Sequence, residues 1–472
     1  IAETRSTIAA SRGAPYQPEL YMRLAELQSE EARYHYMVAY EREQQRAEGL
    51  HVPQVRVLKE QAIGTYRSIL DNHPHTHLAD RILFNISHEQ RELGEFDQMR
   101  ITLEELVDKY PDSPYRAEAL LVLGDYHFDR NKLVFAQRHY EDIIKMGDTP
   151  LLGLAMYKQA WVDVNLGDCE KALEHFEGAI HAARTLEGDE AAEFGAADVG
   201  YHFNEEFEIP QSQKPTWVFA GHMTLNVQRE ALVDLTYCYA QEREPEQATE
   251  YLRGLASSRE AYVASLGKMA HRYALIEQPR GAADVSRELL RLAPDDIERL
   301  DDARMLHRVV TRMNDYSQVG DDVWLILRAM RRQTQQADLE PETRDRLETE
   351  FELMARDLAT KSHRILTGET PVETGTKEWT KTPATPRQTA HAYEVYLEVM
   401  ADSPYTEEVT LNLADVLMDN NRFLEAGHRY REAAALLAGP PPVFDKEEDE
   451  EDADEDAEED AEVSIEDEEE DL

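Results

Sequence analysis

A recurring pair of helices constrains this chain more than any other feature of its sequence. Between residues 80 and 188, an apolar-periodic segment, a turn and a second apolar segment occur three times, with turns at Gly94, Asn131 and Gly167. The second segment of each unit carries a small or slender residue and, four positions later, a large one: Met99/Leu103, Ala136/Tyr140 and Ala172/Phe176. Residues i and i+4 share a helix face, so the first lets two helices approach and the second fills the gap beside it.

The spacing of these pairs is nearly constant. Their first members are 37 and 36 residues apart, and Ala62 lies a further 37 residues before Met99. The pattern returns twice with a period of 34, in Ala248/Ala282 and Ala392/Ala426. A fixed period of this length predicts hairpins that each bury an apolar face against the hairpin before and the hairpin after. The sequence therefore predicts an all-α solenoid of helical hairpins, for which length is no guide to the number of domains.

Gaps in the pattern define the expected domains. We expect a flexible lead-in at 1–17, an N-terminal array at 18–186, a middle array at 218–332 and C-terminal hairpins at 333–438. Within the lead-in, Gly13 and Pro15 argue against a stable helix, whereas Pro18 suits the first turn of a long helix that reaches about Gly49.

Three further segments lack helical periodicity. Residues 187–217 mix glycine, acidic and aromatic residues and predict an irregular insertion, which either packs on the solenoid or contacts a partner. A mobile Thr/Pro-rich loop is expected at 367–386. Residues 439–472 begin with prolines, carry almost no apolar residues, and predict a disordered acidic tail.

The charge is strongly negative. The formal net charge is −46, and residues 445–472 alone hold 20 Asp or Glu against one Lys. Such a chain is repelled by phosphate backbones, so nucleic acid is not expected as a partner. The tail fits a solubilising role, a docking segment for a basic partner, or weak calcium buffering, although no EF-hand loop is present.

The two cysteines, Cys169 and Cys238, fall in non-adjacent hairpins by the repeat register. We therefore expect no disulfide between them and interpret each as a buried or turn thiol, which gives no information on the compartment. No run approaches the ~18 apolar residues of a membrane span. Because the sequence begins at Ile1 and not at Met, a signal peptide or a lipid-attachment cysteine could have preceded it.

Signatures of catalysis and of cofactor binding are not found. The sequence has no glycine-rich phosphate loop, nucleophile elbow, Cys-x-x-Cys pair or metal-binding helix motif, so we expect no enzyme, no cofactor and no metal site. His73, His75 and His77 alternate in a turn, but no acidic or cysteine partner lies near them, and a solvated turn is the expected role. An enzyme within residues 187–217 is the remaining catalytic hypothesis.

The concave face of the stack is the better candidate for function. Gly124 sets the repeat register. In this register, four positions on the first helix of each hairpin face the concave side. The residues predicted to line a partner-binding groove are Phe84, His88, Leu121, Asp125, Phe128, Tyr157, Trp161, Val233 and Tyr237. Aromatic residues in a groove can dock an amphipathic helix or an extended peptide. The alternative is that Phe128, Tyr157 and Trp161 form the core between hairpins.

The repeats resemble the tetratricopeptide repeat (TPR) superfamily through L-G-D-Y at Leu123, the Ala136/Tyr140 pair and the proline at Pro111. R-L-A-E-L at Arg23 and Y-K-Q-A-W at Tyr157 look like the envelope TPR proteins of delta-proteobacteria, a group that includes the outer-membrane-associated lipoproteins of myxobacterial adventurous gliding motility. This resemblance implies a periplasmic scaffold attached to an envelope machine.

The chain departs from TPR co-chaperones, which clamp a C-terminal carboxylate with basic and Asn residues. The matching positions here hold Phe84, Leu121, Asp125 and Trp161, which disfavours a carboxylate clamp. We expect a non-enzymatic protein–protein interaction scaffold. The resemblance implies that it belongs to a bacterial envelope complex, such as a gliding-motility complex, in the periplasm at the outer membrane. The alternatives are an acidic-tailed chaperone or assembly factor for basic clients, and a location in the cytoplasm.

Overall fold

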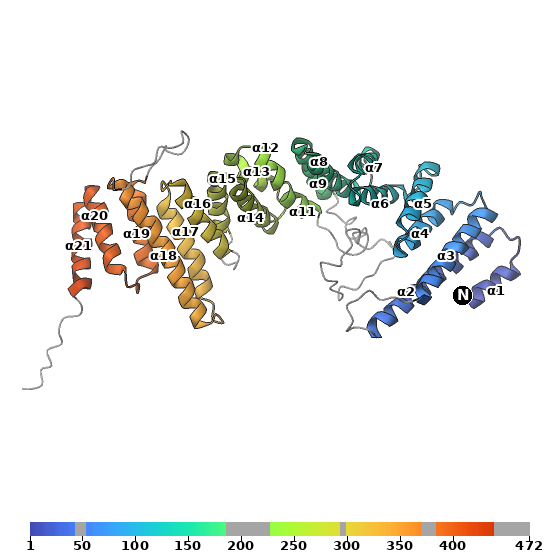
Figure 1. Cartoon of the computed structure of the whole chain (residues 1–472), viewed down its shortest axis with the longest axis horizontal. Coiled ribbons are helices and arrows are strands. Elements are labelled where there is room, and N and C mark those ends of the chain that lie inside the picture. Colours follow the sequence, from blue (N-terminus) through green and yellow to red (C-terminus); the bar gives the residue numbers. More distant parts are fainter. Residues whose placement is uncertain (43–52, 186–226, 293–298, 370–383, 439–472) are drawn as a thin grey trace, which may run out of the picture. The chain divides into compact units, whose positions relative to one another are not determined.

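The structure is a computed structural model that describes residues 1–42, 53–185, 227–292, 299–369 and 384–438. Within these ranges the regular structure is helical and no strand occurs, in agreement with the predicted all-α fold (Figure 1). The predicted insertion at 187–217, the acidic tail at 439–472 and most of the loop at 367–386 lie outside the described residues.

The chain forms two compact units. Of the described residues, the first unit contains those between Ile1 and Asp315 together with Leu325–Phe351, and the second contains Tyr316–Trp324, 352–369 and 384–438. Two helices contribute to both units, namely α17 (Val319–Thr334) and α18 (Pro341–Leu366).

The remaining helices follow in chain order. Those of the N-terminal part of the first unit are α1 (Ala2–Ala10), α2 (Gln17–Arg42), α3 (Pro53–Asn72), α4 (Ala79–Glu92), α5 (Phe96–Lys109), α6 (Arg116–Asp129), α7 (Leu133–Met146), α8 (Leu152–Leu166) and α9 (Cys169–Thr185). The first unit continues with α11 (Val227–Asp234), α12 (Thr236–Glu242), the 3-10 turn η3 (Pro245–Gln247), α13 (Ala248–Leu255), α14 (Arg259–Leu275), α15 (Pro279–Leu292) and α16 (Arg299–Met313). The second unit adds α19 (Pro386–Val399), α20 (Thr406–Asp419) and α21 (Phe423–Ala438).

Successive helices form hairpins that pack on their neighbours. α2 contacts α3, α4 contacts α5, α6 contacts α7 and α8 contacts α9, while α3, α5 and α7 also contact the helix that follows them (Figure 1). The predicted small and large residues lie at these contacts, and all six are buried: Met99, Leu103, Ala136, Tyr140, Ala172 and Phe176. The expectation that hairpins share their apolar faces with their neighbours is confirmed for the hairpins from α2 to α9.

The turns inside the hairpins need a backbone conformation with a positive φ angle. Gly94, Asn131 and Gly167 have φ angles of +77°, +55° and +81°. Positive φ suits glycine, and asparagine to a lesser degree, and it ends a helix by reversing the chain direction. The three turn positions predicted from the sequence are the positions at which α4, α6 and α8 end.

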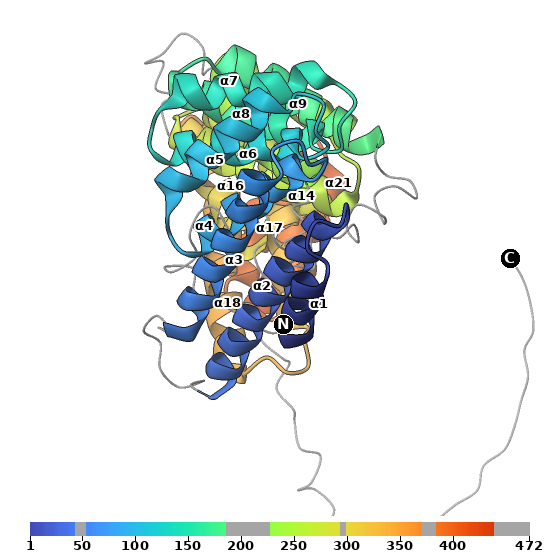
Figure 2. The ribbon, with the colours of Figure 1, turned by 90° about the vertical axis from the view of Figure 1, so that its right-hand side faces the viewer.

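Two local predictions differ from the structure. Residues 2–10 form helix α1, which packs on α2 through the buried Ile8, so the segment is not a lead-in without structure (Figure 2). Its Gly13 and Pro15 instead fall in the turn that separates α1 from α2. The repeat pattern predicts one helix from Ala231 to Tyr239, but this segment is divided into α11 and α12, with a break at Leu235.

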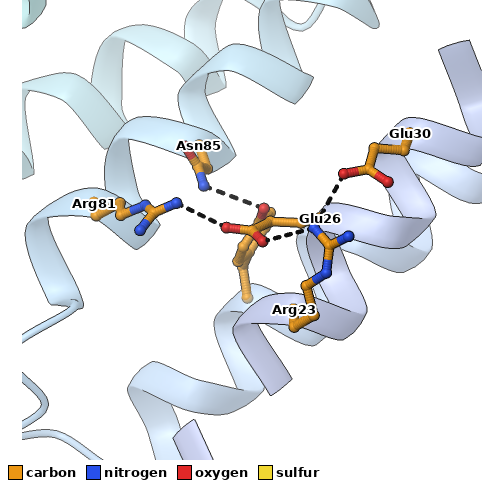
Figure 3. A network of polar contacts seen from close by, with 6 residues as sticks. Arg23, Glu26, Glu30, Arg81 and Asn85 are labelled. Atoms are coloured by element: carbon orange, nitrogen blue, oxygen red, sulfur yellow. Dashed lines mark hydrogen bonds and ion pairs between the residues drawn. The ribbon is translucent and has the colours of Figure 1, made fainter. Parts of the chain in front are cut away.

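Ion pairs connect the first hairpin to the second on its surface. Arg23 contacts Glu26 and Glu30 of its own helix, at 3.3 and 3.1 Å, and Arg81 of α4 contacts Glu26 at 2.9 Å (Figure 3). Beside them, the Asn85 amide donates to the hydroxyl of Tyr66 at 3.2 Å. Exposed pairs of this kind stabilise by less than about 1 kcal/mol each, so they align helices that the apolar core already holds together.

Candidate partner-binding site

The predicted groove residues lie on the first helix of each hairpin, namely α4, α6, α8 and the α11/α12 pair. Gly124 sets their register, since a Cβ there would lie 2.3 Å from Cε1 of Tyr140. Only glycine allows α6 and α7 to approach this closely with the Tyr140 ring between them. The resulting contact fixes which residues of α6 face the neighbouring hairpins.

On α4, the two predicted residues have different surroundings. The Phe84 ring stacks on Tyr115 of the next hairpin, with ring centroids 5.0 Å apart. His88 Nε2 lies 3.8 Å from Oε1 of Glu92. Burial, together with the neighbouring Arg91, holds the pKa of His88 well below its usual range, so this imidazole is neutral at pH 7.

On α6, the predicted residues contact the second helix of their own hairpin and the first helix of the next. Leu121 and Phe128 are half-buried and pack against the cluster of Ala136, Tyr140 and Val162. The carboxylate of Asp125 accepts a hydrogen bond of 2.5 Å from Tyr140 and lies 3.1 Å from the ammonium of Lys158 on α8. These three residues thus join α6 to both α7 and α8.

Tyr157 and Trp161 on α8 share one acceptor. The Tyr157 hydroxyl donates to Oδ2 of Asp234 at 2.6 Å, and the Trp161 indole donates to the same oxygen at 3.2 Å. Burial raises the pKa of Asp234 above its ordinary value. Phe176 lies beneath both aromatic rings, with centroids 6.0 Å from each.

The last two predicted residues differ in exposure. Val233 is buried, whereas Tyr237 is exposed and carries the guanidinium of Arg272 4.0 Å above its ring centroid. Tyr237 is therefore the predicted residue most accessible to a partner. The other eight lie half-buried or buried between hairpins, and whether they bind a partner stays a prediction.

Three charged residues on the same faces were not predicted. Arg91 follows His88 by about one helical turn on α4, and Glu118 lies on α6, near enough for the charges of Arg91 and Glu118 to interact. Burial lowers the pKa of Arg91 and raises that of Glu118. Lys158 completes the row beside Asp125. Arg91 lies about one turn after His88 on α4, and Glu118 lies about two turns before Asp125 on α6, so both fall on the predicted face of their helix. The helical spacing could therefore have identified them.

A buried ion pair lies at one end of this row. The Lys59 ammonium contacts Oε2 of Glu89 at 2.9 Å and also pairs with Glu92. His88, Glu89 and Glu92 come close enough together to hold a metal ion. Because Lys59 already bridges both carboxylates, the geometry fits a buried ion pair between α3 and α4 better than a metal site. The histidines at 73, 75 and 77 lie in the turn between these helices.

A disulfide joins Cys169 at the start of α9 to Cys238 in α12, with Cα atoms 5.0 Å apart. The expectation that these two cysteines are unpaired was wrong. The register placed them in hairpins that are not neighbours, but α11 and α12 pack directly against α9. Both side chains are buried, so the bridge lies inside the contact between the two hairpins.

The comparisons with known proteins agree with this repeat geometry. Residues 90–113, which run from the end of α4 through α5, match the family model of the tetratricopeptide repeat. The chain carries a tetratricopeptide repeat. No curated protein matches the chain.

Among solved structures, the chain is similar to a tetratricopeptide repeat protein from Parabacteroides merdae, at 10% identity over 63% of this chain and 93% of that one, with a TM-score of 0.29. It is also similar to Naa15/Naa10 bound to HypK-THB, at 11% identity over 90% of this chain and 64% of that one, with a TM-score of 0.34. A third similar structure is the apo form of the quorum sensor NprR from B. thuringiensis, at 14% identity over 81% of this chain and 94% of that one, with a TM-score of 0.29.

Within the residues that the structure describes, no helix has the length and apolar character to cross a membrane.

Proposed function

We propose that this protein is a non-enzymatic protein–protein interaction scaffold in the bacterial cell envelope, located in the periplasm and associated with the outer membrane. Its repeat hairpins support the scaffold role, because each hairpin adds surface without requiring a catalytic centre. The resemblance to envelope TPR proteins extends the proposal to a gliding-motility complex.

The disulfide between Cys169 and Cys238 carries the proposed location. Disulfides persist in oxidising compartments such as the periplasm, whereas glutathione and thioredoxin keep cytosolic thiols reduced. Both cysteines are buried and lie on helices that pack together, so the bridge is part of the folded contact. The cytoplasm, the alternative location, would leave two reduced thiols at this position.

Thiol labelling in intact cells tests the location. Cells are treated with an alkylating reagent under denaturing conditions, with and without prior reduction, and the mass of the protein is measured. We expect two labels after reduction and none before it. Two labels without reduction would place the protein in a reducing compartment and contradict the envelope proposal.

The side chains on the first helices of the hairpins, α4, α6, α8 and α12, support partner binding on the face that these helices form, here called the first-helix face. Tyr237 presents an aromatic ring and the Arg272 guanidinium together, and His88, Asp125 and Lys158 add groups of both polarities. Aromatic and arginine side chains of this kind dominate the energetics of many interfaces. The arrangement contains no nucleophile activated by a base, so it supports recognition and not turnover.

Site-specific photocrosslinking tests the scaffold role. A photoreactive amino acid at position 237 should give defined crosslinked products in envelope fractions, because this position lies on the first-helix face. The control places the same amino acid at Val134, an exposed position on α7, the second helix of its hairpin. Equal products from both positions, or none from position 237, would contradict partner binding on the predicted face.

The acidic composition of residues 445–472 supports the second function, a chaperone or assembly factor for basic clients. Here the charge of the tail, and not the helical faces, would supply the affinity. Deleting residues 439–472 separates the two functions. Loss of all client binding on this deletion favours the chaperone, whereas retained crosslinking from position 237 favours the scaffold.

A further inference from the structure

Two hairpins far apart in the sequence have the same residues at the same spacing. Residues of the hairpin α6/α7 and of the hairpin α20/α21 correspond one to one at a separation of 290 positions. Five of these positions hold the same residue and the sixth is apolar in both: Glu118/Glu408, Leu121/Leu411, Asp125/Asp415, Ala136/Ala426, Tyr140/Tyr430 and Phe128/Met418.

The internal geometry of the two hairpins also agrees. The Tyr140 hydroxyl donates to Oδ1 of Asp125 at 2.5 Å, and the Tyr430 hydroxyl donates to Oδ1 of Asp415 at 2.6 Å. The small residue and the tyrosine therefore occupy equivalent places in both. The surroundings of α6/α7 thus indicate what the same face of α20/α21 is built to contact.

In the first hairpin, this face is covered by α8. Leu121 packs in two clusters to which α8 contributes Ala155 and Val162. Lys158, between them on α8, places its ammonium 3.1 Å from Asp125. The covering helix therefore supplies an apolar stripe with one cation, and α6 supplies the matching leucine and carboxylate.

In the second hairpin, the equivalent face is exposed. Leu411, Met418 and Phe423 are 44%, 46% and 58% exposed. Among the residues that the structure describes, no lysine or arginine forms an ion pair with Asp415, and α20 contains four acidic residues and no basic one. We refer to Leu411, Asp415, Met418 and Phe423 as the α20/α21 face.

We infer that the α20/α21 face binds an amphipathic helix of a partner protein, which carries a lysine or arginine spaced from its apolar residues as Lys158 is spaced from Ala155 and Val162. This helix would extend the repeat stack as the first helix of the next hairpin. The inference rests on the proposed scaffold function and specifies its partner class. The leucine and the two flanking apolar residues would bind the stripe, and the carboxylate would bind the cation.

Charge decides between this occupant and two others. The chain's own residues 445–472 offer one lysine against 20 acidic residues, and they would bring like charges to Asp415. A second copy of the chain has the same net charge of −46, so its approach is opposed over long range. A partner helix with a cation at this position brings no like charge to Asp415, and the cation and the carboxylate attract each other.

The test uses a peptide of residues 148–167 of this chain, which contains α8, because that helix covers the equivalent hairpin. The peptide carries a fluorescent label, and its anisotropy is measured against the full-length protein at low salt. We expect saturable binding that falls at least 10-fold with Lys158→Glu in the peptide. Leu411→Glu in the protein should also reduce binding at least 10-fold, whereas Val134→Glu, at an exposed site on α7, should not change it.

A charge test isolates the ion pair. Asp415→Asn keeps an oxygen that can accept a hydrogen bond from Tyr430, so the hairpin stays folded. This substitution should remove most of the preference for the lysine peptide over the glutamate peptide.

No binding by the wild-type peptide, or binding unaffected by Leu411→Glu, would overturn the inference. Self-association that Leu411→Glu abolishes would assign the face to a second copy. A 10-fold gain in peptide affinity on deletion of residues 439–472 would assign it to the tail. Crosslinking from position 237 can succeed in each of these cases, so it reports separately on the scaffold function.

Discussion

Gly124→Ala is the most direct test of the close approach between α6 and α7. The added Cβ would lie 2.3 Å from Cε1, 2.7 Å from Cζ and 2.8 Å from Cδ1 of Tyr140. Carbon atoms without a bond between them are ordinarily ~3.5 Å or more apart. Either the ring or the helix must therefore move by more than a small adjustment.

The surroundings of the Tyr140 ring limit this movement. The ring is fully buried, its hydroxyl is held by Asp125, and Val162 of the next hairpin packs against it. Overpacking of this kind costs about 1–3 kcal/mol, and the rigid site points to the upper end. Replacing glycine by alanine within a helix recovers about 1 kcal/mol of helix propensity. We expect a net loss of about 2 kcal/mol in the free energy of unfolding.

The assay is urea unfolding combined with hydrogen exchange of α6, α7 and α8, since repeat proteins can open locally. Gly64→Ala is the matched control, because a Cβ at this exposed helical glycine meets no atom within 4 Å, and it should stabilise by up to about 1 kcal/mol. At the position equivalent to Gly124, the second hairpin has Ala414, and its tyrosine is only half-buried. Equal or higher stability of Gly124→Ala would refute the argument from close packing.

Three other changes test the remaining contacts. Replacing both Cys169 and Cys238 by alanine should lower the free energy of unfolding by up to about 4 kcal/mol, as expected for a bridge that closes a loop of 69 residues, and urea unfolding under oxidising conditions measures it. Asp234→Ala should cost about 1–3 kcal/mol, because it leaves the Tyr157 hydroxyl without its acceptor, and faster hydrogen exchange in α11 should accompany the loss. Burial lowers the pKa of His127 to about 4, so the unfolded chain binds a proton more readily than the folded one. Stability should therefore fall as the pH is lowered from about 6.5 to about 4, and His127→Gln should flatten this dependence in thermal unfolding scans.

The hairpins could be predicted from the sequence because their determinants are local. A small residue and a large one four positions apart, such as Ala136 and Tyr140, report on a single helix face, and Gly94 and Gly167 report on a single turn. In the same local way, Pro341 predicts the start and Gly368 the end of a long helix, and α18 runs from Pro341 to Leu366. Each of these signals lies within one or two helical turns of the feature that it predicts.

The contacts between distant segments could not be predicted in this way. Asp234 lies 77 and 73 residues from its donors Tyr157 and Trp161, and no periodic pattern connects them. Predicting the disulfide would have required the knowledge that α12 packs against α9, whereas the repeat register placed the two cysteines in hairpins that are not neighbours. A single charged residue such as Lys158 has no signal of its own, because 31% of the chain is charged.

The disulfide has its largest effect where the repeat pattern is interrupted. About 40 residues separate Thr185 at the end of α9 from Val227 at the start of α11. A covalent bridge across a loop of 69 residues contributes about 4 kcal/mol. Under oxidising conditions the bridge therefore reinforces the contact between α9 and α12, beside the packing of α11 on α9 and the hydrogen bonds from Tyr157 and Trp161 to Asp234.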